Sequence, residues 1–183
     1  EKAGGGEIEP QTAHTPFDIW ITARDTFNNT VINFTGTVAL STDAGAITPA
    51  TVDFVSSDSG IHQASVTVMQ AGTNKHISAS ADADAGSSNP FTVNKASATV
   101  TLDAAALTQT YDGTGRIVTA TTDPAGLTVH ITYDGSSTPP INVGTYAVVA
   151  AIDDEGYEGS ASGTLTVSKR PITVTADAKT KVY

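Results

Sequence analysis

The sequence predicts an all-β protein built from antiparallel β-sandwiches in tandem. Thr, Ser, Ala and Val dominate the composition, and the 16 glycines and 8 prolines recur at short intervals, as in chains of many short strands joined by turns. Apolar and polar residues alternate in short runs, which is the period of a strand with one buried face. A length of 183 residues with 39% hydrophobic residues is enough for one or two domains with ordinary cores.

The clearest alternation is in residues 17–24. One face of this expected strand is apolar, whereas the other carries three polar side chains and a tryptophan. The two faces are Phe17, Ile19, Ile21 and Ala23, and Asp18, Trp20, Thr22 and Arg24. Further strands are expected at 37–41, 51–55, 63–69, 75–81 and 91–94. Six strands separated by turn-rich joints predict a sandwich.

A second set of strands follows the same pattern. We expect them at residues 98–102, 116–121, 127–133, 145–152 and 162–167. The run 145–152 is apolar on both faces, which predicts a central strand covered on both sides. Turns are marked by Asp112-Gly113, Asp123-Pro124, Asp134-Gly135 and Pro139-Pro140.

A near-repeat indicates how the domains are arranged along the chain. The segment Lys95-Ala-Ser-Ala-Thr-Val-Thr-Leu-Asp-Ala104, followed by Tyr111, returns about 72 to 74 residues later as Lys169-Arg-Pro-Ile-Thr-Val-Thr-Ala-Asp-Ala178, followed by Tyr183. Such a repeat is typical of arrays of folded units. We therefore predict a flexible lead at 1–14, β-sandwiches at 15–95 and 96–168, and the first strand of a further repeat at 169–183.

Charge and composition exclude several classes of function. A formal net charge of -10, with only 9 scattered Lys and Arg residues, argues against nucleic acid as a partner. The chain has no cysteine, so disulfides and thiolate metal sites are excluded. It also has no apolar run of the roughly 18 residues that a membrane-spanning helix needs.

Trp20 is the single residue that most suggests binding. Counting by two places it on the polar face of its strand, beside Asp18, Thr22 and Arg24. An exposed tryptophan beside polar groups could stack on a sugar ring or anchor a protein partner. The alternative is structural: both strand faces are covered, or a bulge shifts the register.

Two acidic clusters raise the possibility of a calcium site, and no other cofactor is expected. They are Asp82 with Asp84, and Asp153-Asp154-Glu155. Calcium takes six to eight oxygen ligands, often from carboxylates and carbonyls close in sequence. The alternative is that these are solvated carboxylates in loops, since neither cluster has the spacing of a dedicated calcium loop.

The chain shows no constellation of catalytic residues. Its four histidines, at 14, 62, 76 and 130, lie far apart and lack metal-ligand spacing. The Gly-x-Ser-x-Gly, phosphate-loop and His-Glu-x-x-His motifs are all missing from the sequence. We therefore expect no enzymatic activity within these residues.

Residues 97–168 closely resemble the MBG domain, an immunoglobulin-like repeat of large bacterial secreted and surface proteins. The resemblance is carried by Tyr111-Asp-Gly-Thr114, by residues 120–135, by Asn142-Val-Gly-Thr-Tyr146 and by residues 156–167. It implies an extracellular β-sandwich repeat, and this family has no catalytic residues that could be transferred.

Residues 15–93 are similar to another immunoglobulin-like module of bacterial surface proteins, with filamin-like character. The carrying residues are Thr15-Pro-Phe-Asp18, 23–30, 34–38, Ala71-Gly72 and Asn89-Pro-Phe-Thr-Val93. The two resemblances together imply tandem immunoglobulin-like antiparallel β-sandwiches.

We therefore expect a spacer or stalk segment of a large bacterial cell-surface or secreted protein of adhesin type. Two alternatives stay open: a module that itself binds a glycan or host protein, and an accessory segment of a large secreted enzyme. Expected partners are neighbouring immunoglobulin-like repeats of the same chain and, for the binding module, a glycan or surface protein. The expected location is extracellular or at the bacterial cell surface.

Overall fold

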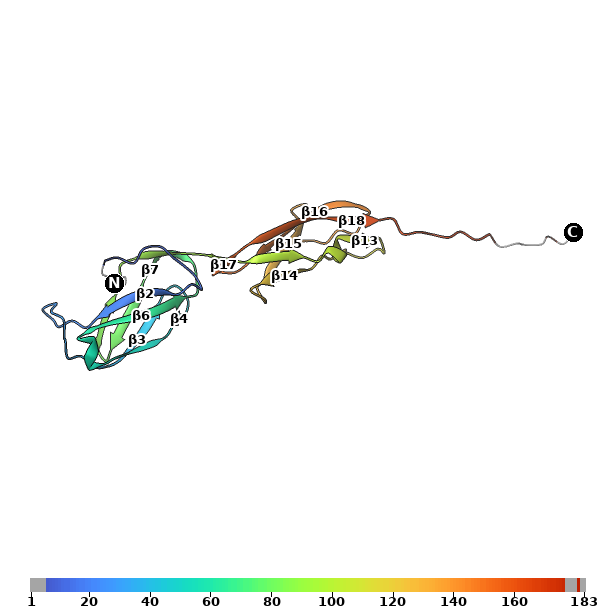
Figure 1. Cartoon of the computed structure of the whole chain (residues 1–183). Coiled ribbons are helices and arrows are strands. Elements are labelled where there is room, and N and C mark those ends of the chain that lie inside the picture. The colour runs from blue at the N-terminus through green and yellow to red at the C-terminus, as the bar shows by residue number, and fades with distance from the viewer. Residues whose placement is uncertain (1–5, 177–180, 182–183) are drawn as a thin grey trace. The chain divides into compact units, whose positions relative to one another are not determined.

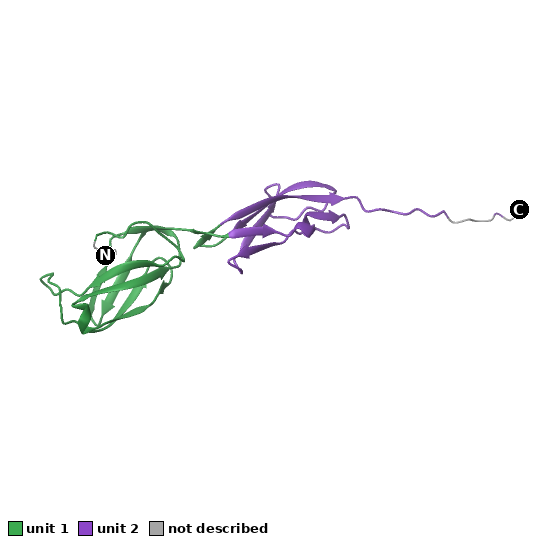
Figure 2. Cartoon of the chain, viewed as in Figure 1, with its two compact units in different colours: residues 1–98, 153–158 green, residues 99–152, 159–183 purple. Residues whose placement is uncertain are grey.

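The computed structural model describes residues 6–176 and residue 181, and it forms two compact units (Figures 1 and 2). The first unit contains the described residues up to 98 together with 153–158, and the second contains 99–152 and the described residues from 159 onward. Within the described residues the regular elements are strands, apart from two short 3-10 helices. The predicted fold class, tandem immunoglobulin-like β-sandwiches, is confirmed.

The first unit is built from three sheets. Their strand orders are β2-β6-β4, β5-β3-β8-β9 and β1-β10-β7, and a parallel pair β11-β17 adds to them. The strands and one helix are β1 (Gln11–Thr12), β2 (Phe17–Thr22), β3 (Gly36–Thr42), β4 (Ile47–Thr48), β5 (Thr51–Phe54), η1 (Ser56–Asp58), β6 (Ile61–Val68), β7 (Gly72–Lys75), β8 (Ile77–Ala81), β9 (Asp84–Ser87), β10 (Phe91–Asn94), β11 (Ala96–Ser97) and β17 (Tyr157–Glu158).

The core of this unit follows the predicted alternation. Ile19 of β2 is buried, and Val66 and Val68 of β6 are fully buried. Phe17 and Ile21 pack against the same cluster from the partly exposed ends of β2. Antiparallel pairing of β2 with β6 therefore brings the apolar faces of both strands to one side, as their period of two requires.

The flexible lead predicted for residues 1–14 is wrong for residues 8–13. Ile8 and Ala13 are buried, and β1 pairs in parallel with β10. Ile8 and Asn89 also form a reciprocal pair: the Ile8 amide donates to Asn89 Oδ1 at 2.8 Å, and Asn89 Nδ2 donates to the Ile8 carbonyl at 3.1 Å. Sequence periodicity missed this segment because a two-residue strand is too short to alternate.

The domain limits also differ from the predicted division at residues 95 and 96. Residues 96–98 and 153–158 belong to the first unit, where the amides of Ala96 and Ala98 donate to the carbonyls of Gly156 and Glu158 at 2.8 Å each. These bonds join residues about 60 apart in sequence, so no local pattern could indicate them.

The second unit consists of two sheets. Their orders are β13-β18-β16-β15 and β12-β14. The elements are β12 (Thr99–Leu102), η2 (Ala104–Leu107), β13 (Thr108–Thr110), β14 (Ala120–Asp123), β15 (Val129–Tyr133), β16 (Gly144–Ile152) and β18 (Ser160–Ser168). The buried cluster of this unit is small: Val118, Tyr133, Val148, Leu165 and Val167.

Two strand predictions in this unit need correction. The strand expected at 116–121 lies at Ala120–Asp123, while Val118 is buried in an irregular segment. Burial of Val118 is stabilised by its amide, which donates to the Tyr133 hydroxyl at 2.8 Å. The strand 145–152 is covered on one face only, since Val148 is buried while Val149 is 44% exposed. The prediction that both faces are covered is wrong because apolar residues such as Val149 lie on the face exposed to solvent.

Residues 169–176 form no regular element and are exposed. They were predicted to begin a further repeat, but a strand needs a hydrogen-bonded neighbour, and no described residue pairs with them. Residues 177–180, 182 and 183, the remainder of that predicted strand apart from Lys181, lie outside the described residues. The further repeat stays a prediction.

Candidate functional site

Trp20 lies in the wall of a groove in the first unit. Its strand β2 is at the edge of a sheet: among the described residues β2 pairs with β6 alone. The groove opens between β2 and the β8–β9 hairpin, with a volume of about 240 Å³. Its lining is mostly apolar and includes the buried residues Ile8, Ile19, Leu40 and Ile77.

The groove also has a polar side. Trp20, Thr22 and Arg24 line it from β2 and the residues that follow, while Ser87 and Ser88 line it from the opposite hairpin. An indole beside a guanidinium and hydroxyls can hold a flat apolar group that has polar edges, such as a sugar ring or an aromatic side chain. Binding at Trp20, which the sequence suggests, stays a prediction, and Trp20 itself is half-buried rather than fully exposed.

Sequence reasoning missed two residues that follow β2. Arg24 was placed on the polar face of its strand, with no indication that it would line a cavity. Phe27 was considered only as part of the segment 23–30 that carries a resemblance, yet it is 85% exposed. The exposure of Phe27 could have been predicted from its position between Asp25 and Asn29. Both residue types favour tight turns, and a side chain at the tip of a turn is commonly exposed.

Two of the acidic residues suggested for calcium have a structural role in turns of the backbone. Asp82 forms the β8–β9 turn in the left-handed conformation, with φ of 51°. Asp154 Oδ1 accepts the amides of Gly156 and Tyr157 at 2.8 and 3.0 Å. Asp84, Asp153 and Glu155 are exposed.

Within the part of the chain that the structure describes, no three His, Asp or Glu side chains form a group that could hold a metal ion. The two acidic clusters are therefore not brought together into one such group. A calcium site stays a prediction, which a comparison of melting temperatures in calcium and in a chelator tests.

A third polar cluster lies in the second unit, at the Tyr111-Asp-Gly-Thr motif. Asp112 Oδ1 accepts the Thr114 amide at 2.9 Å and its hydroxyl at 2.7 Å, and it is paired with the Arg116 guanidinium. Hydrogen bonds from Arg116 and then Thr114 lower the pKa of Asp112 to about 2 from the usual 3.8. The motif is therefore a turn held by a carboxylate.

We expect this turn to make the second unit acid-sensitive. Because the folded pKa of Asp112 is below its unfolded value, its contribution to stability is present above about pH 4 and is lost as the pH falls towards 2. Melting curves of Asp112→Asn should therefore depend less on pH than those of the parent across this window. An equal acid response in both chains would show that Asp112 is not the group responsible.

In the described residues, no helix has the length and the apolar character needed to cross a membrane.

Comparison with known proteins identifies one family. Residues 98–171 match the model of the MBG domain. The resemblance inferred from the sequence is thus confirmed for this segment, and it supports a role as a repeat of a surface protein. Comparison with curated protein sequences gives no match.

Comparison with solved structures gives several similar chains. The chain is similar to the adhesin InvE of Yersinia pseudotuberculosis (17% identity, TM-score 0.45), where the match covers 87% of this chain and 56% of that one. It is also similar to domains 4–9 of the surface layer protein SbsC (11%, TM-score 0.34, 90% and 30%). Tandem Ig repeats of Dlar match at 9% identity and a TM-score of 0.30, with coverage of 90% and 94%. The chain thus spans about half of the InvE chain and under a third of the SbsC chain.

Proposed function

We propose that these residues are a spacer segment of a large bacterial cell-surface or secreted protein, whose function is to hold another domain away from the cell. The main support is the MBG domain at residues 98–171, together with the near-repeat that begins at Lys95 and again at Lys169. A repeat module whose core consists mainly of aliphatic side chains supplies stability rather than chemistry. We propose no catalytic role for it.

An exchange experiment in the parent protein tests the spacer role. Residues 15–168 are replaced by two unrelated β-sandwich domains of similar combined length, and in a second chain they are deleted. A spacer should tolerate the replacement, because only its length matters, whereas the deletion should reduce the activity displayed by the rest of the protein. Loss of that activity in the replaced chain, with normal surface display, would refute the spacer role.

A second candidate function is binding of a glycan or a host surface protein, and the groove at Trp20 favours it. The purified chain is applied to a panel of glycans and extracellular-matrix proteins. Because the chain contains 1 Trp, the tryptophan emission, excited at wavelengths that its 5 tyrosines do not absorb, reports on this groove. Saturable binding that Trp20→Ala abolishes would favour a binding module. The matched control is Ile117→Ala, an exposed apolar side chain of the second unit.

The accessory-segment alternative depends on the rest of the protein. It would be supported by a catalytic domain elsewhere in the same polypeptide and by lower turnover on insoluble substrate when residues 15–168 are removed.

A further inference from the structure

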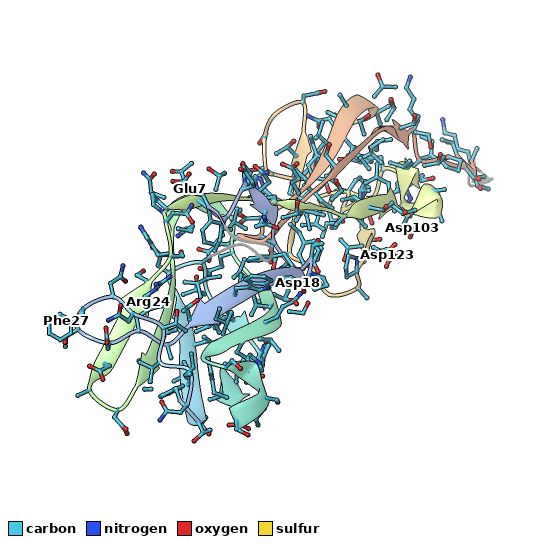
Figure 3. All side chains as sticks on the ribbon, turned by 60° about the vertical axis from the view of Figure 1, so that its left-hand side comes forward. Glu7, Asp18, Arg24, Phe27, Asp103 and Asp123 are labelled. Carbon is cyan, nitrogen blue, oxygen red and sulfur yellow. The ribbon has the colours of Figure 1, made fainter. Side chains whose placement is uncertain are left out.

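The first unit presents a phenylalanine on a projecting loop. Phe27 is 85% exposed, the highest value among the large apolar side chains described for this unit. Figure 3 shows Phe27 at the outer end of the loop and Arg24 towards its base. Moving a phenyl ring from water into an apolar site is favourable in free energy. An exposed ring of this kind therefore marks a surface that association can stabilise.

Hydrogen bonds hold this loop in one conformation. Asp25 Oδ1 accepts the amides of Phe27 and Asn29 at 2.9 and 2.8 Å. Asp25 Oδ2 accepts from Asn29 Nδ2 at 3.1 Å, and Arg24 Nη1 donates to the Asn28 carbonyl at 3.2 Å. Because the loop is already ordered by these bonds, binding of the ring costs little additional conformational entropy of the loop.

The groove at Trp20 has the size and lining for a phenyl ring. Its volume of about 240 Å³ exceeds the roughly 150 Å³ of an apolar protein cavity that accommodates benzene. Ile19, Leu40 and Ile77 supply apolar contacts, and Trp20 supplies an aromatic partner for stacked or edge contacts. The groove thus complements the side chain that the neighbouring loop presents.

Charges at the two features are complementary. Arg24 lines the groove, while Asp25 is next to Phe27 on the loop. Hydrogen bonds from Asn29 lower the pKa of Asp25, so this carboxylate is charged at neutral pH. If Phe27 of one copy enters the groove of another, the opposite charges of Asp25 and Arg24 favour the approach of the two copies.

The loop that carries the ring begins beside the groove, since Arg24 lines the groove and its guanidinium donates to the Asn28 carbonyl of the loop. A ring and a groove carried by the same domain can be exchanged reciprocally about a two-fold axis, which closes the assembly at two copies. We propose that two copies of this chain associate by reciprocal insertion of Phe27 into the Trp20 groove. This association is independent of the spacer role.

Sedimentation equilibrium of the whole chain tests the proposal, at about 0.15 M salt to screen the net charge of -10. We expect a weak, concentration-dependent dimer below about 1 mM, accompanied by a change in Trp20 emission. Phe27→Ala should weaken the association at least about tenfold, because it removes both inserted rings. Ile32→Ala is the control: Ile32 is 68% exposed and does not line the groove, so this variant should dimerise as the parent does.

A second variant fills the groove instead of removing the ring. Gly86 lies opposite Ala79 across β8 and β9, and both line the groove. A Cβ at Gly86 meets nothing within 4 Å, so Gly86→Leu should fold normally and prevent dimerisation. Melting curves verify that each variant is folded.

Three results would overturn the proposal. The chain could remain monomeric at every concentration, or Phe27→Ala could dimerise as well as the parent. In the third case no dimer forms, but saccharides change the emission of Trp20, and the groove is then a saccharide site instead.

Discussion

Leu165→Ala is expected to destabilise the second unit by about 2–5 kcal/mol. Leu165 is fully buried at the centre of a core whose other buried members are Val118, Tyr133, Val148 and Val167. Truncation removes apolar contacts and leaves a cavity that neighbouring strands cannot fill, because β18 is held between β13 and β16. In so small a core, this loss is a large fraction of a domain's total stability.

The measurement is thermal unfolding of the parent and the variant followed by calorimetry. We expect the transition of the second unit to fall by more than about 10 °C. Thr166→Ala is the matched control, since it is the next residue of β18 and faces solvent, and its effect should stay under about 1 kcal/mol. A loss below about 1 kcal/mol for Leu165→Ala would show that the core can collapse around the gap.

Gly60→Ala is expected to destabilise the first unit by at least about 2 kcal/mol. Gly60 has φ of 80°, in the left-handed region, and an added Cβ would lie 2.5 Å from the Val31 carbonyl oxygen and 2.9 Å from its carbon. Backbone rather than a flexible side chain would have to move. The Val31 amide also donates to the Ala23 carbonyl at 2.9 Å, so the shift would disturb the end of β2.

Gly113→Ala separates the two causes of this loss. Gly113 has nearly the same dihedral angle, with φ of 87°, but a Cβ there meets nothing within 4 Å. Gly113→Ala should therefore lower the free energy of unfolding by the conformational strain alone, about 1 kcal/mol, as measured by urea unfolding. Equal losses for the two variants would mean that the close approach to Val31 contributes nothing.

Much of the fold could be predicted from local sequence patterns. Alternation at Phe17, Ile19 and Ile21 correctly identified β2 and its buried face, because a strand's side chains point to opposite sides in turn. The residues of the MBG resemblance identified the second domain, and the family match confirms it. Trp20 was recognised as unusual because it breaks the polar pattern of its own face.

The groove itself could not be predicted from the sequence. Its lining joins Ile8, Trp20 and Leu40 with residues of β8 and β9, which lie much further along the chain. Which side chains share a cavity depends on strand order, and strand order is decided by non-local pairing. The exposure of Phe27 has the same origin, since only the completed sandwich shows that no described strand covers its loop.

The sequence by itself determined that this protein is all-β, that its strand at residues 17–22 buries Ile19, and that it contains an MBG domain. These features depend on short periodic patterns and on motifs of consecutive residues. Only the tertiary structure decided that residues 8–13 and 153–158 complete the first unit, that Val149 faces solvent, and that Trp20 and Arg24 line one groove. The physical reason is that parallel pairs, edge strands and grooves arise from contacts between segments that are distant in sequence. A local sequence pattern does not specify which distant segments come into contact.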